Sequence, residues 1–286
     1  MPTWTAEIAV DEALARTLVA PFGFEHVRLL SRGWDRTAWL VEEQWVFGFP
    51  RRAVVVPGLE RELAWLPRVA PQLPTPIPNP EFVGEPSDAF PWPFFGSAYI
   101  AGEEAALTEL DDEQRTAAGV ELACFLRVLH AIDGTGLPLD GNNRADMGYR
   151  VPYTRDLFVQ LGREVPRALD EAESLPSPPE PSTIAHGDLH DRQVLVHEGR
   201  LSGVIDWVDI CRGDPSIDLI MLWSFVPASG REAFLDAYGG ADDAMLLRSR
   251  VLALMMGAVL ALYARDQAQT QLESASLAMI ERSLSD

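Results

Sequence analysis

The stretch from Ile184 to Val196 reads IAHGDLHDRQVLV and is the most informative part of the chain for the fold. An apolar start leads into His-Gly-Asp, a short polar loop follows, and the closing Val-Leu-Val predicts a strand. Such a loop holds one carboxylate, that of Asp188, at a fixed point between two buried segments. Alone, the tripeptide is equally consistent with a turn that an aspartate caps.

A second apolar strand follows at Gly203 to Ile205 and delivers another carboxylate, Asp206. Two buried strands that each end in an aspartate favour a cradle for Mg²⁺ and a transferring phosphoryl group. One aspartate can orient or deprotonate an incoming hydroxyl, and the other can hold the metal that bridges the phosphates. An aspartate after an apolar strand is also a common turn former. The interpretation therefore rests on the occurrence of both segments together.

Three motifs in this order, HGDLH, GVIDW and GDPSIDL (213–219), resemble the aminoglycoside phosphotransferase family. That family includes macrolide and other antibiotic kinases, is related to choline and homoserine kinases, and is similar in fold to the eukaryotic protein kinases. GWDRTAWLV (33–41) and VFGFPRR (46–52) extend the resemblance, which covers residues 31–223. It implies a two-lobed α+β fold of the protein-kinase type.

The resemblance assigns roles to the motif residues. Asp188 is expected to be the catalytic base, and Asp206 and Gln193 are expected to bind Mg²⁺. His186 is expected to shape the loop around Asp188. Asp214 and Asp218 are expected to brace that loop from behind, and the GDP tripeptide is also typical of a helix N-cap followed by proline.

The resemblance also places a nucleotide, ATP or GTP, against the first third of the chain. The segment from Ser31 to Thr37 is expected to lie over the phosphates. Ala98 and Ile100 are expected to offer backbone groups to the purine, and Glu62 to pair with a cation on a strand. The residues implied in nucleotide binding are Ser31, Gly33, Trp34, Asp35, Val46, Glu62, Ala98 and Ile100.

Two positions depart from the family pattern. Strand alternation puts Gly48 on the face expected to meet the nucleotide, where the family has Lys or Arg, so Glu62 is expected to lack its partner. Arginines 32, 36, 51 and 52 are the candidates to supply the missing cation. Gln193 replaces the usual Asn and has one more methylene, which changes its reach by about 1.5 Å.

We expect an N-terminal nucleotide-binding lobe over residues 1–100 and a helical C-terminal lobe over residues 101–286. Strands are predicted at 26–30, 37–42, 44–49 and 94–100, with a turn at Glu43. A helix is predicted at 59–69, and another begins after Thr108 as its N-cap. Further helices are predicted at 154–173, 217–225, 231–238, 244–265 and 271–284.

The net charge of −20 argues against nucleic-acid partners, which require basic surfaces. It suits a cationic substrate, but it is also typical of an ordinary soluble surface. The chain contains no lysine, so all 23 basic side chains are arginine and phosphate must be met by arginine, backbone or metal. Two separated cysteines, an acidic N-terminus and a 14-residue apolar run at Val251–Ala264, too short for a bilayer, favour a cytoplasmic protein without a membrane partner.

The expected function is Mg²⁺-dependent transfer of the γ-phosphoryl group of ATP or GTP to a hydroxyl of a small molecule, with an aminoglycoside- or macrolide-type antibiotic as the leading class. Alternatives are a kinase-like nucleotide-binding protein impaired by Gly48 and Gln193, and a kinase of a small metabolite alcohol. Acids that could meet ammonium groups are Glu103, Glu104, Asp140, Asp146, Asp209 and Asp242. Apolar walls for a macrolide could come from Met221, Trp223, Met255 and Met256, which also fit an ordinary core.

Overall fold

The computed structural model describes residues 6–33, 35–181 and 183–285 and divides into two compact units. The N-terminal unit comprises Met1–Gln72, Pro76–Ile100 and Asp206–Val208. The C-terminal unit comprises Leu73–Thr75, Ala101–Ile205 and Asp209–Asp286. The short segment that carries Asp206 thus belongs with the strands of the N-terminal unit, although it lies far along the chain.

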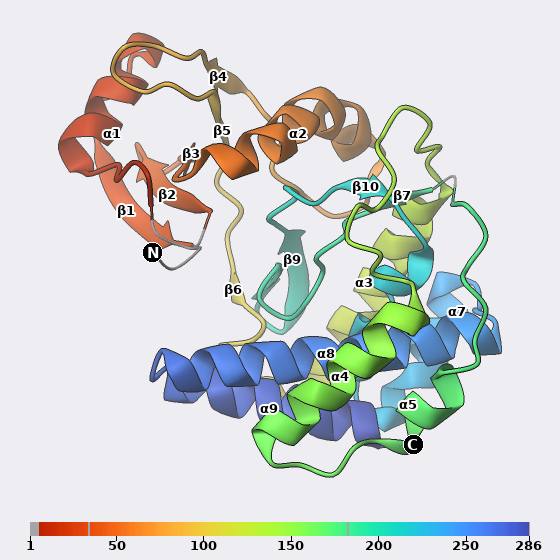
Figure 1. The fold of residues 1–286 in the computed structure, drawn as a ribbon. Helices are drawn as coiled ribbons and strands as arrows, with labels where there is room; N and C mark the ends of the chain where they lie inside the picture. Colours follow the sequence, from red (N-terminus) through yellow and green to blue (C-terminus); the bar gives the residue numbers. More distant parts are fainter. Residues whose placement is uncertain (1–5, 34, 182, 286) are drawn as a thin grey trace. The chain divides into compact units, whose positions relative to one another are not determined.

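The N-terminal unit is built on a five-stranded antiparallel sheet in the order β1-β2-β3-β5-β4 (Figure 1). Helices α1 (Glu12–Val19) and α2 (Val56–Val69) belong to the same unit. The strands are β1 (Val27–Arg32), β2 (Arg36–Val41), β3 (Trp45–Pro50), β4 (Phe82–Gly84) and β5 (Phe94–Ala98).

One face of this sheet carries an aromatic core. Phe47 and Phe49 are fully buried and pack with Phe94, whereas Val46 and Gly48 on the opposite face are only half-buried. This confirms the alternation predicted for the strand, because successive side chains point to opposite faces. The turn predicted at Glu43 is also confirmed.

The C-terminal unit is mainly helical, which together with the N-terminal sheet confirms the predicted α+β fold class. Its short strands form two small sheets, β6 (Glu103–Glu104) with β8 (Val194–His197) and β9 (Arg200–Val204), and β7 (Ile184–Ala185) with β10 (Cys211–Arg212). The helices are α3 (Asp112–Ala131), α4 (Met147–Leu161), α5 (Arg167–Ala172), α6 (Met221–Ser224), α7 (Arg231–Tyr238), α8 (Asp243–Asp266) and α9 (Thr270–Leu284).

Helix α8 is the central element of the C-terminal unit and packs against α9 and α4 (Figure 1). It begins at Asp242, whose side chain accepts a hydrogen bond from the backbone N–H of Met245 at 2.7 Å. By length and composition it could cross a membrane, with a mean hydropathy of 1.8, but 61% of its most apolar stretch is buried inside the protein. This burial is typical of a core helix, as predicted for 251–264.

Several predicted boundaries were wrong, each for a local reason. The N-cap of α3 is Asp111, not Thr108, because Asp111 forms a capping box with Gln114. The helix predicted at 154–173 is two helices, since Gly162 ends α4 in a left-handed conformation and Pro166 precedes α5. The segment 217–225 has only a 3₁₀ turn followed by the single turn of α6, and α1 was not predicted.

Candidate active site

The HGD loop, residues 186–193 between β7 and β8, is held by its own histidine. Nδ1 of His186 accepts a hydrogen bond from the backbone N–H of Asp188 at 3.3 Å, so Nε2 carries the proton and donates to the carbonyl of Ile205 at 2.9 Å. The ring therefore ties the loop to the residue that follows β9. This is the shaping role that the sequence predicted for His186.

Asp218 braces the same loop from beneath. It is fully buried and accepts hydrogen bonds from the backbone N–H groups of His186 at 2.8 Å and of Gly187 at 3.1 Å. Burial raises the pKa of Asp218, but the hydrogen bonds from His130 and from the loop outweigh it and leave the pKa below its usual value. Asp218 is thus an ionised acceptor for the loop, and Asp214 caps the adjacent 3₁₀ turn through the N–H of Ser216.

Gly187 is required by a close approach of two backbone segments. Its φ is +91°, and a Cβ there would lie 2.4 Å from the carbonyl oxygen of Asp209. No L side chain fits both conditions without moving the backbone. The adjacent Asp188 is half-buried, with 36% of its side chain exposed.

His190 lies behind the catalytic-base candidate. Its Nε2 is 3.9 Å from Oδ2 of Asp188, and its Nδ1 accepts from the N–H of Arg192 at 3.3 Å. Burial, with the charge of Arg192, lowers the pKa of His190 to about 3. His190 is therefore neutral at physiological pH.

The two residues predicted to bind metal belong to different units. Asp206 lies in the N-terminal unit, is exposed and has a φ of 65°, which is uncommon outside glycine and often marks functional positions. Gln193 is buried in the C-terminal unit. Among the described residues, no three His, Cys, Asp or Glu side chains gather into a metal cage. Taken singly, the carboxylate of Asp206 and the amide oxygen of Gln193 are both oxygen donors of the kind that Mg²⁺ prefers.

Glu62 has no partner at position 48, as predicted, and one of the four candidate arginines takes that place. Glu62 is buried on α2 and forms an ion pair with Arg36 of β2, in which Nη1 donates to Oε1 at 3.1 Å and Nη2 donates to Oε2. Gly48 leaves the neighbouring position on β3 empty, and the side chain of Arg36 passes over it. The cation therefore comes from the neighbouring strand.

The loop between β1 and β2 is tied down by two other arginines. Arg51 donates to the carbonyl of Gly33, and Arg52 pairs with Asp35. Ser31 lies in β1 and is exposed, and Trp34 lies outside the described residues.

The remaining nucleotide-binding candidates lie along β3 and β5. Val46 pairs with Ser97 in the sheet, and Ala98, opposite Trp45, is the last residue of β5. The N–H of Tyr99 donates to the carbonyl of Gln44 at 2.7 Å, and Ile100 ends the unit. The sheet therefore brings Val46 and Ala98 together on neighbouring strands.

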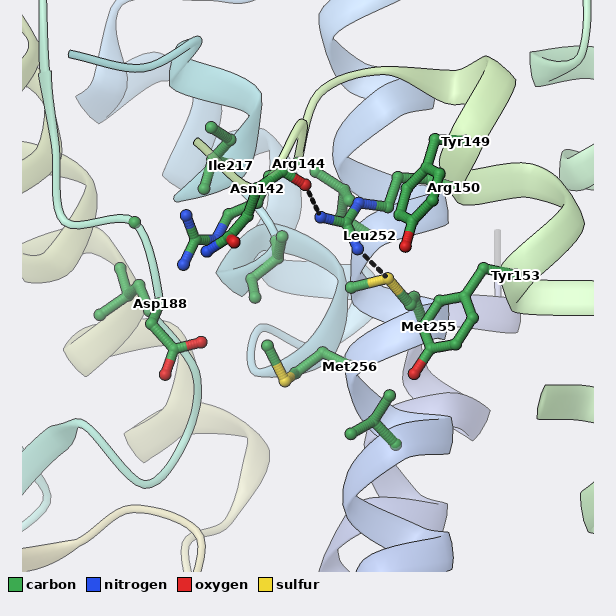
Figure 2. A pocket seen from close by; sticks show the side chains of 14 residues that line it. Asn142, Arg144, Tyr149, Arg150, Tyr153, Asp188, Ile217, Leu252, Met255 and Met256 are labelled. Atoms are coloured by element: carbon green, nitrogen blue, oxygen red, sulfur yellow. Dashed lines mark hydrogen bonds between the residues drawn. The ribbon is translucent and has the colours of Figure 1, made fainter. Parts of the chain in front are cut away.

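A cavity of about 310 Å³ opens beside Asp188, entirely within the C-terminal unit (Figure 2). The apolar part of the lining comes mainly from α8 and from the segment before α6. Met255 and Met256, predicted as possible pocket walls, both line it, whereas Met221 is fully buried in the core and Trp223 stacks under Arg231 and Arg250. The apolar lining residues are Leu189, Ile217, Ile220, Leu252, Met255, Met256 and Val259.

Arginine and tyrosine side chains also line the cavity, next to the apolar ones (Figure 2). Arg150 of α4 donates to the carbonyls of Asn142 and Asn143 and to the sulfur of Met255, and its charge lies 5.1 Å from the ring of Tyr149. Tyr149 and Tyr153 are exposed at 58% and 41% and lie one turn apart on α4. The polar lining residues are Asn142, Arg144, Tyr149, Arg150, Tyr153 and Asp188.

Arg144 forms ion pairs with two of the acids predicted to meet a cationic substrate. It bonds Asp140 at 2.6 Å and Asp209 at 2.8 Å. Burial lowers the pKa of Arg144, but these two carboxylates outweigh it and the net shift is upward. One guanidinium thus serves both carboxylates, and neither carboxylate is left without a basic partner.

The other predicted acids do not line the cavity. Asp146 and Asp242 cap α4 and α8, Glu104 pairs with Arg192, and Glu103 lies in β6. Within the described chain, Asp188 is the one carboxylate in the lining.

Sequence reasoning missed the arginines and tyrosines of this cavity. They lie in a stretch between the predicted helices that carries none of the recognised motifs. A usable signal was present, since Tyr149 and Tyr153 have the i, i+4 spacing of one helix face.

Comparisons with known proteins identify the family and the fold. The family model described as the phosphotransferase enzyme family, APH, matches residues 26–252. Comparison with the curated proteins gave no match.

Solved structures with the same fold include two kinds of antibiotic kinase. A GDP complex of aminoglycoside 2'-phosphotransferase-IIIa has a TM-score of 0.71 at 20% identity, covering 96% of this chain and 98% of that one. A GDP and kanamycin complex of APH(2")-IIia has a TM-score of 0.69 at 20% identity, covering 95% and 97%. Macrolide 2'-phosphotransferase MphH from Brachybacterium faecium, without ligand, has a TM-score of 0.61 at 23% identity, covering 93% and 97%.

These likenesses confirm the protein-kinase-like α+β fold, and the family model spans well over half of the chain. The chain therefore belongs to the APH phosphotransferase enzyme family and is a small-molecule kinase.

Proposed function

We propose that this kinase transfers the γ-phosphoryl group of ATP or GTP to a hydroxyl of a small molecule that has an apolar face and little positive charge. Asp188 orients the acceptor hydroxyl and takes its proton as the new O–P bond forms and the bond to the nucleoside diphosphate breaks. The observation that carries the proposal is the position of Asp188, on a loop braced by Asp218 and at the wall of a cavity.

The charges around this cavity favour a macrolide-type over an aminoglycoside-type acceptor. A polycation is bound best by several unpaired carboxylates, and here Asp140 and Asp209 are paired with Arg144. A second guanidinium, Arg150, lines the cavity and would repel an ammonium group. Met255 and Met256 supply the adaptable apolar surface that a hydrophobic ring system needs.

The N-terminal unit is the proposed nucleotide-binding part and the C-terminal unit the acceptor-binding part. Val46, with the backbone of Ala98 and Ile100, would contact the purine, and the segment containing Ser31, Gly33 and Asp35 would cover the phosphates. Asp206 and Gln193 would hold Mg²⁺, which when bound neutralises charge on the phosphates.

A cytoplasmic location completes the proposal. Both cysteines are free, which fits a reducing compartment, and the substrate nucleotide is supplied there.

A small metabolite alcohol is the second candidate acceptor, and the size of the cavity favours it. A volume of about 310 Å³ is at the lower end of the range for small-molecule sites. A macrolide would have to leave most of its ring outside, against Tyr149 and Tyr153.

The test is phosphoryl transfer to a panel of acceptors. The protein is incubated with Mg²⁺, with ATP or GTP, and with macrolides, aminoglycosides and small metabolite alcohols, and products are identified by mass spectrometry. We expect a macrolide or a small uncharged alcohol to gain one phosphoryl group, and the Asp188→Asn variant to give none. Product from aminoglycosides alone would overturn the substrate class, and no product from any acceptor would overturn the transfer itself.

A further inference from the structure

We infer that Arg36 is the phosphate-binding cation of this kinase and has replaced, from the neighbouring strand, the basic residue that Gly48 lacks. The inference rests on the proposed function, because it assigns the group that receives the nucleotide's α- and β-phosphates. Nothing in the resemblance of the sequence assigns this role to residue 36.

The strand register places Arg36 beside Gly48. In the sheet Gly48 lies between Ala38 on β2 and Phe95 on β5. Arg36 and Ala38 are two residues apart on β2, so their side chains point to the same face. A Cβ built on Gly48 would be 3.7 Å from Cδ of Arg36, and the guanidinium carbon lies 5.8 Å from the ring centre of Phe95. Because residue 48 is a glycine, the side chain of Arg36 has room to extend across the sheet at this position.

The ion pair with Glu62 fixes the position of the Arg36 guanidinium. Both carboxylate oxygens of Glu62 are engaged, so the pair is bidentate and its orientation is defined. The side chain of Glu62 is 2% exposed, whereas that of Arg36 remains 16% exposed. The carboxylate is therefore committed to Arg36, while Nε of the guanidinium is buried without a hydrogen-bond partner among the described residues and can still donate to an anion.

The surrounding charges point to phosphate as that anion. Burial lowers the pKa of Arg36, and the nearby carboxylates Asp206 and Asp35 raise it, so both acids act on this guanidinium within the same unit. Asp206 is the proposed Mg²⁺ ligand, and a metal of that kind sits on the phosphate oxygens. A cation within electrostatic range of Asp206 is therefore placed to meet the same phosphates.

The other three candidate arginines have different surroundings. Arg51 and Arg52 hold Gly33 and Asp35 of the loop, and Arg32 is exposed. Since the chain has no lysine, Arg36 is the basic side chain that combines burial, the Glu62 pair and the influence of Asp206.

The test moves the charge between strands and measures nucleotide binding without any acceptor. Arg36→Ala/Glu62→Gln removes the cation without stranding a buried carboxylate. Arg36→Ala/Gly48→Arg returns the cation to β3, and Gly48→Ala is the matched control, since its Cβ makes only ordinary contact. Binding of ADP, GDP, adenosine and guanosine is measured by calorimetry with Mg²⁺, and thermal unfolding shows that each variant is folded.

We expect Arg36→Ala/Glu62→Gln to weaken binding of the preferred diphosphate about 10- to 100-fold and to leave binding of its nucleoside unchanged. Arg36→Ala/Gly48→Arg should recover most of the loss, and Gly48→Ala should bind like the parent protein. If the parent and the folded Arg36→Ala/Glu62→Gln variant bind the diphosphate with equal affinity, Arg36 does not have this role. That result would leave the proposed kinase function standing. A parent protein that binds neither diphosphate would overturn both this role and the proposed kinase function.

Discussion

Nε2 of His130 lies 3.1 Å from Oδ2 of Asp218, the carboxylate that holds the backbone of the HGD loop. Nδ1 of the same ring is 2.8 Å from the hydroxyl of Tyr238, so a buried chain of hydrogen bonds runs from α7 through α3 to the loop. His130 and Asp218 come from separate helical regions, and their contact fixes the loop against the core of the C-terminal unit.

Replacing Asp218 by Asn should impair both folding and turnover. The amide nitrogen would face N–H donors that now bind a carboxylate, in a site that is fully buried. Unsatisfied buried groups of this kind cost about 1–3 kcal/mol each. We expect a lower midpoint of thermal unfolding and a fall in kcat greater than in the Asp236→Asn control on the exposed face of α7. Parent-like kcat in Asp218→Asn would contradict the bracing role.

Replacing Asp188 by Asn should remove turnover and leave the fold intact. The side chain is half-exposed and Asn has nearly the same shape, so the packing around it should be kept. General-base catalysis contributes about 10²- to 10⁴-fold, and kcat should fall by that order while nucleotide affinity is kept. Asp156→Asn, exposed on α4, is the control for a lost surface charge. Turnover in Asp188→Asn above about a tenth of the parent value would point to another base.

Truncating Met256 should raise KM for an apolar acceptor and leave kcat nearly unchanged. Met256 is half-buried in the cavity wall, so its loss should cost about 1 kcal/mol of contact, or about fivefold in KM. Met245→Ala, at the start of the same helix and outside the cavity lining, is the matched control. An acceptor whose KM is the same in both variants does not bind against α8.

Acid should destabilise the protein through His190. The unfolded chain binds a proton at His190 below pH 6.5, whereas the folded protein does so only near pH 3. The free energy of unfolding should therefore fall as the pH drops through this window, by about 1.4 kcal/mol per unit. Denaturant titrations at several pH values should show a shallower fall in His190→Gln than in His197→Gln, whose histidine is exposed at the end of β8. Equal slopes would show that His190 is protonated in the folded protein.

Local sequence was sufficient to predict the loop around Asp188, because its chemistry lies within one contiguous stretch flanked by apolar strands. The bracing by Asp218 was implied by the resemblance to the aminoglycoside phosphotransferase family, and the structure shows it as two backbone hydrogen bonds. Helix ends were less predictable, since Gly162 ends α4 inside a stretch whose apolar pattern continues.

The partner of Glu62 could not be chosen from the sequence alone. Four arginines lie near Gly48 in the chain, and only the register of β2 against β3 shows that Arg36 crosses the empty position. The pairing of charges near the cavity could not be predicted, for a similar reason. Asp140 and Asp209 are acids in the sequence, but Arg144 is brought between them only in the folded C-terminal unit.

The absence of lysine has a consequence for detection of this enzyme in living cells. An electrophile carried on a nucleotide can label a kinase beside the phosphates through a lysine amine, which acts as a nucleophile once deprotonated. Here the cation beside Glu62 is a guanidinium, which stays protonated and does not act as a nucleophile under such conditions. A proteome survey that relies on amine-directed nucleotide probes would pass over this kinase even where it is abundant and active.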